Sequence, residues 1–269
     1  MTWITARRRH PAAGYAVVLL GLLCVGFGYA SATGGSSASA SAPGVTLAAQ
    51  ISQGQSIFNK NCSSCHGQFG QGVTGVAPSL IGVGAAAVDF QVSTGRMPAK
   101  EPGAENPRKP VQLNPQQTSE VAAYIASLGG GPAIPTASQV SQTGANPGFG
   151  QQLFVADCAQ CHNFVGAGGA LTYGKYAPAL TASTPRQIYE AMLTGPEAMP
   201  VFNNTTITPQ QKRDVIAYVV QTRNEPNPGG FSLGRVGPVT EGLVAFLGLL
   251  LFMVFAAMWL TAKHGKAHE

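Results

Sequence analysis

The sequence predicts an all-α protein in which two tandem domains lie between an N-terminal and a C-terminal transmembrane helix. Three observations support this fold class. Two segments of the 269-residue chain repeat the same order of residues, each segment ends in an amphipathic stretch opened by a proline, and a long uncharged run flanks the pair on either side. Alternating patterns typical of strands are sparse. Two small helical domains with membrane anchors are therefore expected.

The repeat is visible without any comparison with relatives. Gly54 and Phe58 in the first segment, and Gly150 and Phe154 in the second, stand at the same distances before a Cys-x-x-Cys-His string. Both segments then continue with matching stretches, which are Ala77-Pro78-Ser79-Leu80 and Ala177-Pro178-Ala179-Leu180, Met97-Pro98 and Met199-Pro200, and finally Tyr124 and Tyr218. This agreement indicates two copies of one domain.

Helix boundaries follow from capping residues and prolines. Asn114 and Thr208 are good N-cap residues, and the proline after each suits the first helical position, where its missing N–H costs nothing. We therefore expect helices at 115–128 and 209–223. Further helices are expected at 50–61, 86–93, 148–157 and 185–193. Gly54 and Gly150 would let the helices that contain them approach another helix closely.

Two strings, Cys62-Ser63-Ser64-Cys65-His66 and Cys158-Ala159-Gln160-Cys161-His162, have the pattern that attaches c-type haem. Two thiols three residues apart on one helical turn can each add across a porphyrin vinyl group, and the next histidine can bind the iron. The sequence therefore predicts two covalent haems, one on Cys62 and Cys65 and one on Cys158 and Cys161. His66 and His162 are the expected nitrogen ligands.

The sixth iron ligand is expected to be a methionine, because the other histidines lie in the terminal segments. Met97 is the methionine of the first segment, whereas the second offers Met192 and Met199. Met199 is favoured because it shares the Met-Pro context of Met97, while Met192 on a helix face is typical of core packing. With both axial positions filled, such an iron is suited to electron transfer, and no catalytic residue is predicted.

Two other uses of the cysteines stay open at this stage. A thioredoxin-like redox pair would need a βαβ setting, and half of a zinc site would need further cysteine or histidine ligands. Neither is visible in the sequence. The fifth cysteine, Cys24, lies in the N-terminal apolar run, where a thiol behaves as a small hydrophobic group.

The basic residues mark membrane flanks. Only 10% of the residues are charged, and the formal net charge of +5 comes largely from Arg7–Arg9 and from Lys263 and Lys266. The uncharged runs 12–32 and 243–262 are each long enough to cross a bilayer. Basic flanks stay cytoplasmic, so both termini are expected in the cytoplasm and both domains on the outer, periplasmic side of the plasma membrane. No basic stripe suggests nucleic acid.

The expected organisation has nine parts. They are a cytoplasmic N-terminus (1–11), a transmembrane helix (12–32), a flexible tether (33–48), the first haem domain (49–129), a linker (130–147), the second haem domain (148–224), a linker (225–242), a transmembrane helix (243–262) and a cytoplasmic tail (263–269). The first span can also be interpreted as a cleaved signal peptide with the cleavage site Ala30-Ser31-Ala32. Its length favours a retained anchor.

Each unit, with this order of motifs, resembles the class I cytochrome c fold. Two such units between two spans resemble the dihaem cytochrome c subunit (cytochrome cc) of the actinobacterial cytochrome bcc complex, a menaquinol–cytochrome c reductase. The resemblance implies a proton-translocating oxidoreductase in which this chain is the electron carrier. It implies as partners a cytochrome b subunit, a Rieske iron–sulfur subunit and an aa3-type oxidase in a supercomplex, with menaquinol as the substrate of the complex.

The resemblance also implies that Pro78 and Pro178 present a carbonyl to the axial imidazole. Electrons would enter at the first haem, from the Rieske centre, and leave from the second, to the oxidase. Three alternatives stay open: a tethered dihaem carrier without a fixed complex, the cytochrome subunit of another periplasmic dehydrogenase or oxidase, and a dihaem peroxidase with one open iron position.

The two units differ in one loop. The first unit carries extra residues within 99–113, and five of them are charged, namely Lys100, Glu101, Glu105, Arg108 and Lys109. This loop has two interpretations, a docking loop for a partner subunit or a solvated loop.

Overall fold

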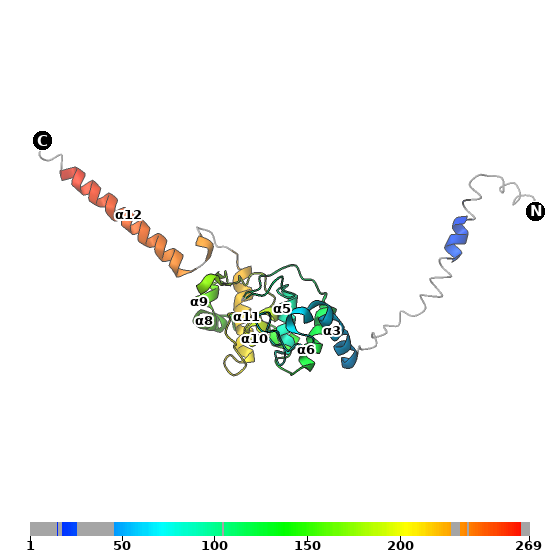
Figure 1. Ribbon diagram of the computed structural model, residues 1–269. Coiled ribbons are helices and arrows are strands. Elements are labelled where there is room, and N and C mark those ends of the chain that lie inside the picture. Colours follow the sequence, from blue (N-terminus) through cyan, green and yellow to red (C-terminus); the bar gives the residue numbers. More distant parts are fainter. Residues whose placement is uncertain are drawn as a thin grey trace, which may run out of the picture. The chain divides into compact units, whose positions relative to one another are not determined.

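Figure 1 shows the computed structural model of the chain. The structure describes residues 15, 18–25, 46–103, 105–226, 232–235 and 237–264, and the side chains of the last helix as far as residue 262. Within these residues the secondary structure is mainly helical, with one pair of two-residue strands. The predicted all-α class is confirmed for the two repeated segments.

Every helix that the sequence predicted in the repeated segments is present. The first segment contains α3 (Leu47–Asn61), α4 (Ser63–His66), α5 (Gly84–Ser93) and α6 (Pro115–Ser127). The second contains α8 (Pro147–Asp157), α9 (Ala159–His162), β1 (Gly169–Ala170), the 3-10 turn η2 (Thr172–Gly174), β2 (Tyr176–Ala177), α10 (Pro185–Thr194) and α11 (Pro209–Asn224). The strands β1 and β2 pair antiparallel. The bounds agree with the predicted ranges to within a few residues.

The predicted caps fix the starts of the long helices. The Asn114 side chain accepts a hydrogen bond from Gln117 N, and the Gln117 side chain accepts one from Asn114 N. Thr208 and Gln211 form the same reciprocal pair at the start of α11. Each pair satisfies backbone N–H groups that a helix start leaves open.

In each half, the first and last helices cross at a glycine. A Cβ atom on Gly54 of α3 would lie 1.9 Å from Glu120 O of α6, and one on Gly150 of α8 would lie 1.9 Å from Asp214 O of α11. Next to these crossings an aromatic pair fills each core, Phe58 with Tyr124 and Phe154 with Tyr218, both with ring centroids 5.3 Å apart. The expectation that the glycines permit close helix contact is confirmed.

The segment 130–147, predicted as a linker, contains the one-turn helix α7 (Ala137–Val140). Thr136 caps this helix in the same reciprocal way with Gln139, and α7 contacts α10 and α11. At the other end of the segment, Pro132 O accepts a hydrogen bond of 3.0 Å from Ala86 N. The segment therefore packs against both halves of the chain that it connects.

The two halves meet through α5 and α10. Asp89 and Glu190 occupy the same position in these two helices, and Arg186 Nη1 lies 3.9 Å from the Asp89 carboxylate. Glu190 is 0% exposed, and within the described part of the chain neither of its carboxylate oxygens has a hydrogen-bond partner. The pKa of Glu190 is raised from 4.5 to about 10, mainly by loss of hydration and also by the nearby Asp89 carboxyl, while Arg186 opposes the shift.

One described helix is long and apolar enough to cross a membrane. It is α12 (Pro238–His264), of which Pro238–Ala262 meets that criterion. The 3-10 turn η3 (Leu233–Arg235) precedes it. The predicted C-terminal span 243–262 lies within α12. Most of the predicted N-terminal span 12–32 lies outside the described residues, although Tyr15 and residues 18–25 are helical.

Gly150→Ala should weaken the second domain. The added methyl group would meet a backbone oxygen that cannot move independently of α11, so we expect a loss of about 1–3 kcal/mol or more of unfolding free energy. The matched control is Gly148→Ala in the same helix, where the nearest atom to a new Cβ is Asn146 Oδ1 at 3.4 Å. Thermal unfolding of the haem-loaded protein measures both. Equal midpoints for the two variants would contradict the crossing argument.

Glu190→Gln should stabilise the protein, and more at higher pH. Between about pH 4.5 and 10 the folded chain keeps a proton on Glu190 that the unfolded chain has lost, so stability falls as pH rises through this window. Removing the group should add about 1–3 kcal/mol at pH 8 and less at pH 6. Denaturant unfolding at both pH values measures this gain.

The control for this change is Glu120→Gln. Glu120 is also buried, but its carboxylate accepts a hydrogen bond of 2.9 Å from Gln116 Nε2, so its replacement should not stabilise the protein. A Glu190→Gln variant that is less stable than the parent at both pH values would show that the buried carboxyl is favourable.

Candidate haem sites

Both cysteine motifs turn the chain in the same way. Cys62 N donates to Phe58 O at 2.8 Å, which closes the last turn of α3, and His66 N donates to Cys62 O at 3.0 Å. The second motif repeats both bonds, at 2.8 Å from Cys158 N and at 2.9 Å from His162 N. The similar bonding explains how two distant sequence segments form equivalent sites.

An apolar cavity lies beside each motif. Cys62, Cys65, His66, Pro78 and Met97 line the first, together with core residues that include Phe58, Leu80, Val88, Val92, Val121 and Ile125. Cys158, Cys161, His162, Pro178 and Met199 line the second, together with Phe154, Leu180, Ile188, Met192, Phe202, Val215 and Val219. Each predicted set of site residues therefore lines one cavity.

The imidazole of each motif is held by a proline carbonyl. His66 Nδ1 lies 2.9 Å from Pro78 O, and His162 Nδ1 lies 2.9 Å from Pro178 O. A carbonyl oxygen can only accept, so the proton of each bond belongs to Nδ1 and the lone pair belongs to Nε2. Burial also lowers the pKa of His162, although the bond to Pro178 opposes this. A neutral imidazole with a free Nε2 is suited to bind a metal.

A glycine lets the chain fold back to the proline in each site. Gly72 N donates to His66 O at 2.7 Å, and Gly168 N donates to His162 O at 3.0 Å. Both glycines have a positive φ, and a Cβ atom on either would lie within 3 Å of the backbone next to the proline. The loop in the second site is longer and contains the β1–β2 pair.

The cysteines do not have the character of a redox dithiol. Burial raises the pKa of Cys62 to about 11, with Cys65 as a further cause. It raises the pKa of Cys158 to about 12, with Asp157 and Cys161 as further causes. Reactive dithiols need a lowered thiol pKa. Among the described residues no group of three or more His, Cys, Asp or Glu side chains could hold a metal ion, which also disfavours a zinc site.

The residues of each cavity fit a covalently attached haem. Two thiols on one turn match two vinyl groups, an imidazole that is buried in the first site and half-buried in the second offers Nε2, a thioether lies in the same cavity, and the rest of the lining is mainly apolar. The second cavity contains two thioethers, since both Met192 and Met199 line it. Met192 is 2% exposed and belongs to the core cluster, whereas Met199 packs against that cluster from its edge.

Some charged residues at the second cavity were not expected from the sequence. Arg96, Glu105 and Arg108 of the first segment line it, and so does Glu197. The only local signals were that Arg96 precedes Met97 and that Glu197 lies close to Met199, and neither indicates a contact between segments. The fold is needed to bring these residues to one cavity.

The geometry defines a c-type cytochrome with two haem-binding domains. Residues 51–129 match the family model for cytochrome c, and residues 145–219 match that for the cbb3-type cytochrome c oxidase subunit III. The chain is 42% identical to the cytochrome bc1 complex cytochrome c subunit of Corynebacterium efficiens, over 80% of this chain and 77% of the relative. It is 44% identical to that subunit of Mycobacterium tuberculosis, over 80% and 79%.

The chain belongs to the family of cytochrome bc1 complex cytochrome c subunits. It therefore carries two covalently bound c-type haems and acts in electron transfer as part of a membrane-associated oxidoreductase.

Proposed function

We propose that this chain passes electrons one at a time from a Rieske iron–sulfur protein, through its two haems, to an aa3-type oxidase. It would do so within a menaquinol–cytochrome c reductase that also contains a cytochrome b subunit. The observation that carries the proposal is the pair of equivalent cavities, each with two thiols, a carbonyl-bound imidazole and a thioether. A single such cavity would fit a simple carrier, whereas two within one chain fit a relay.

Each residue of the sites has a proposed role. Cys62 and Cys65 hold the first haem, and His66 and Met97 are its axial ligands. Cys158 and Cys161 hold the second, with His162 and Met199 as ligands. Haem iron supplies reversible one-electron chemistry when bound, and a methionine ligand favours the ferrous state and raises the potential. The apolar lining excludes water, and the two proline carbonyls orient the imidazoles and hold the ring proton on Nδ1, which leaves Nε2 for the iron.

We further propose that the chain has two membrane spans, with both termini in the cytoplasm and both haem domains outside. The helix α12 supports the second span. The proposed first span, 12–32, rests on the absence of charge and on Arg7–Arg9 before it.

One observation favours a second candidate function. The match of residues 145–219 to a cbb3-type oxidase subunit suits a cytochrome subunit attached directly to an oxidase. That match concerns one domain, whereas the similarity to cytochrome bc1 complex subunits extends over 80% of the chain. The reductase is therefore the preferred assignment, and direct transfer to an oxidase agrees with both.

Met97→Leu and Met199→Leu should each remove the sulfur-to-iron charge-transfer band of one haem and lower its potential, on the order of 100 mV, because axial ligands set haem potentials over about 0.8 V. Optical redox titration of the purified protein measures both effects. The matched control is Met192→Leu, which keeps core volume and should leave both haems unchanged. A loss of the band in Met192→Leu but not in Met199→Leu would make Met192 the ligand.

Purification through this chain in a mild detergent should recover a cytochrome b, a Rieske protein and an aa3-type oxidase. The reason is that a doubly anchored haem relay works only beside its donor and acceptor. Mass spectrometry identifies the subunits, and the intact mass of the chain counts its covalent haems. A dihaem chain that is recovered alone would support the tethered carrier instead.

A further inference from the structure

The first domain contributes a buried cation to the cavity of the second. Arg96, the residue directly before Met97, lines that cavity. Only 6% of Arg96 is exposed, and its Nη1 has no hydrogen-bond partner among the residues that the structure describes. A guanidinium group stays charged at neutral pH, and a buried charged donor without an acceptor costs free energy. The orphaned donor therefore indicates that an acceptor belongs in the cavity.

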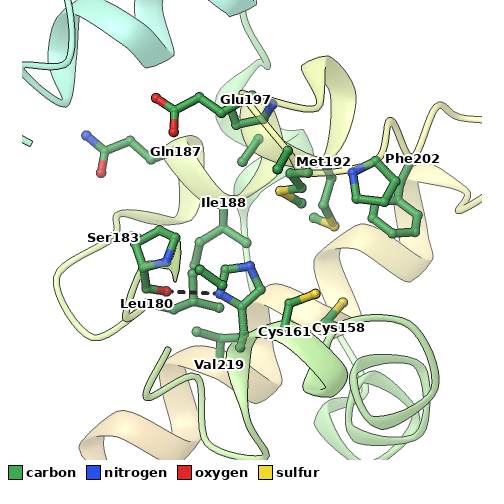
Figure 2. A pocket seen from close by; sticks show the side chains of 18 of the residues that line it. Cys158, Cys161, Leu180, Ser183, Gln187, Ile188, Met192, Glu197, Phe202 and Val219 are labelled. Atoms are coloured by element: carbon green, nitrogen blue, oxygen red, sulfur yellow. Dashed lines mark hydrogen bonds between the residues drawn. The ribbon is translucent and has the colours of Figure 1, made fainter. Parts of the chain in front are cut away.

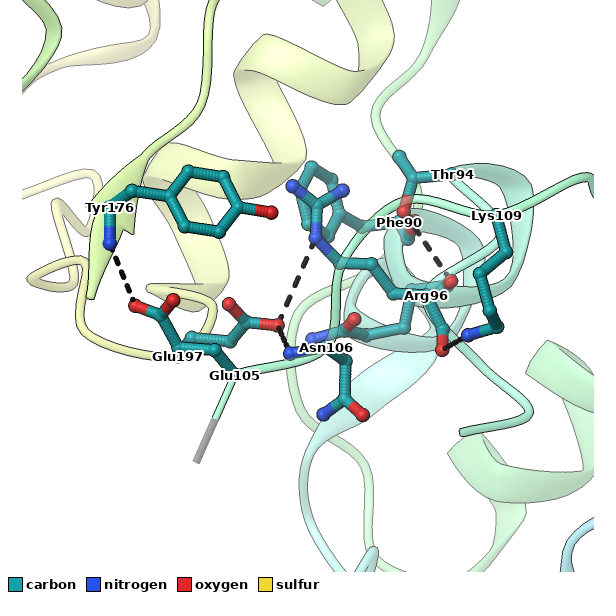
Figure 3. Close-up of polar contacts among 9 residues, drawn as sticks. Phe90, Thr94, Arg96, Glu105, Asn106, Lys109, Tyr176 and Glu197 are labelled. Atoms are coloured by element: carbon teal, nitrogen blue, oxygen red, sulfur yellow. Dashed lines mark hydrogen bonds and ion pairs between the residues drawn. The ribbon is translucent and has the colours of Figure 1, made fainter. Parts of the chain in front are cut away.

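The surroundings hold the Arg96 side chain in one orientation. Its Nε lies 3.9 Å from Glu197 Oε1 of the second domain, and its Cζ lies 5.1 Å from the centre of the Phe90 ring. Figure 3 shows the guanidinium group beside that ring, with the Tyr176 ring pointing toward it. Nε of the guanidinium group faces Glu197, so Nη1 is the nitrogen that can donate to another acceptor.

The extra loop of the first unit fixes the backbone at this point. Lys109 Nζ donates to Arg96 O at 2.6 Å. Gly95 has a φ of 72°, and a Cβ on it would lie 1.9 Å from Lys109 O, so the loop rests directly on the chain before Arg96. Within the same loop Asn106 N donates to Glu197 Oε1 at 2.8 Å, and Glu105 accepts a bond of 3.2 Å from Tyr176 N.

The chemistry of the acceptor follows from the position of the cysteines. In a haem the two propionate carboxylates lie on the ring edge opposite the vinyl groups that react with thiols. In Figure 2, Gln187 and Glu197 lie across the cavity from Cys158 and Cys161. The neighbouring Arg108 Nη2 donates to Ser183 Oγ at 3.1 Å on that same side. Two guanidinium groups thus stand where a ring fixed at the two cysteines would direct its carboxylates.

We propose that Arg96 of the first domain binds a propionate carboxylate of the haem in the second domain through Nη1. This rests on the haem sites proposed above. Such a charge-assisted bond would satisfy the buried donor. It would also connect the haems, because the residue next to the axial ligand Met97 of the first haem would hold the edge of the second. Arg96 is thus a positioning residue that raises the potential of the second haem.

The test is Arg96→Leu in the full chain, with the two haems first assigned by Met97→Leu and Met199→Leu. Loss of a nearby positive charge disfavours adding an electron, so the reduced-to-oxidised ratio of the second haem should fall on the order of tenfold at the parent's midpoint potential. The first haem should keep its potential and its sulfur-to-iron band. Arg96→Lys should restore part of the shift, since it restores the charge.

The control is Arg213→Leu. Arg213 lies in the second domain and donates to Ser141 O, but it does not line the cavity, so both potentials should stay unchanged. A shift confined to the first haem would show that Arg96 only supports Met97, and this overturns the proposal. If neither methionine variant changes a haem, the proposed ligation fails instead.

A structure of the haem-loaded chain within its complex tests the same contact without a variant. A propionate oxygen of the second haem within about 3.2 Å of Arg96 Nη1 is expected. An Arg96 directed to any other acceptor would overturn the proposal even if Arg96→Leu fails to fold.

Discussion

Both haem sites depend on the crossing of the first and last helices of each domain. At Gly54 and Gly150 the backbone of one helix touches the backbone of the other, so no side chain can separate them. This contact fixes the end of the first helix, which lies directly before the cysteines and contributes one ring of the aromatic pair of the core. A wider crossing would move the thiols relative to the methionine and the proline carbonyl that complete each cavity.

The parts of the fold that were predicted from sequence are those decided by local interactions. Asn114 and Thr208 cap helices through neighbours three residues away, and the cysteine motifs close through bonds of the same range. The repeat added the equivalence of the two sites. These features appear in a sequence because the interacting residues lie within one or two helical turns.

The parts that were missed depend on contacts between distant segments. The residues next to Glu190 in the sequence do not predict that its side chain is fully buried, in a helix that packs against α5. The charges of the loop 99–113 were interpreted as solvated or as directed to another subunit. Lys100 and Glu101 are indeed exposed, but Glu105 and Arg108 contact the second domain of the same chain. Charge alone does not distinguish a surface loop from a polar interface.

The interface between the domains explains why this loop matters. Tandem domains move relative to each other unless the interface is large and apolar. Here α5 and α10 bring two carboxyl groups together, and the buried one, Glu190, has no hydrogen-bond partner in the described ranges. A buried polar group without a partner costs free energy, so this contact contributes little to the stability of the domain interface. The hydrogen bonds of Asn106 and Glu105 with the second domain add the favourable polar contacts that α5 and α10 do not provide. A longer loop in one unit of an otherwise matching repeat therefore adds the polar contacts that hold the two domains, and with them the two cavities, in one arrangement.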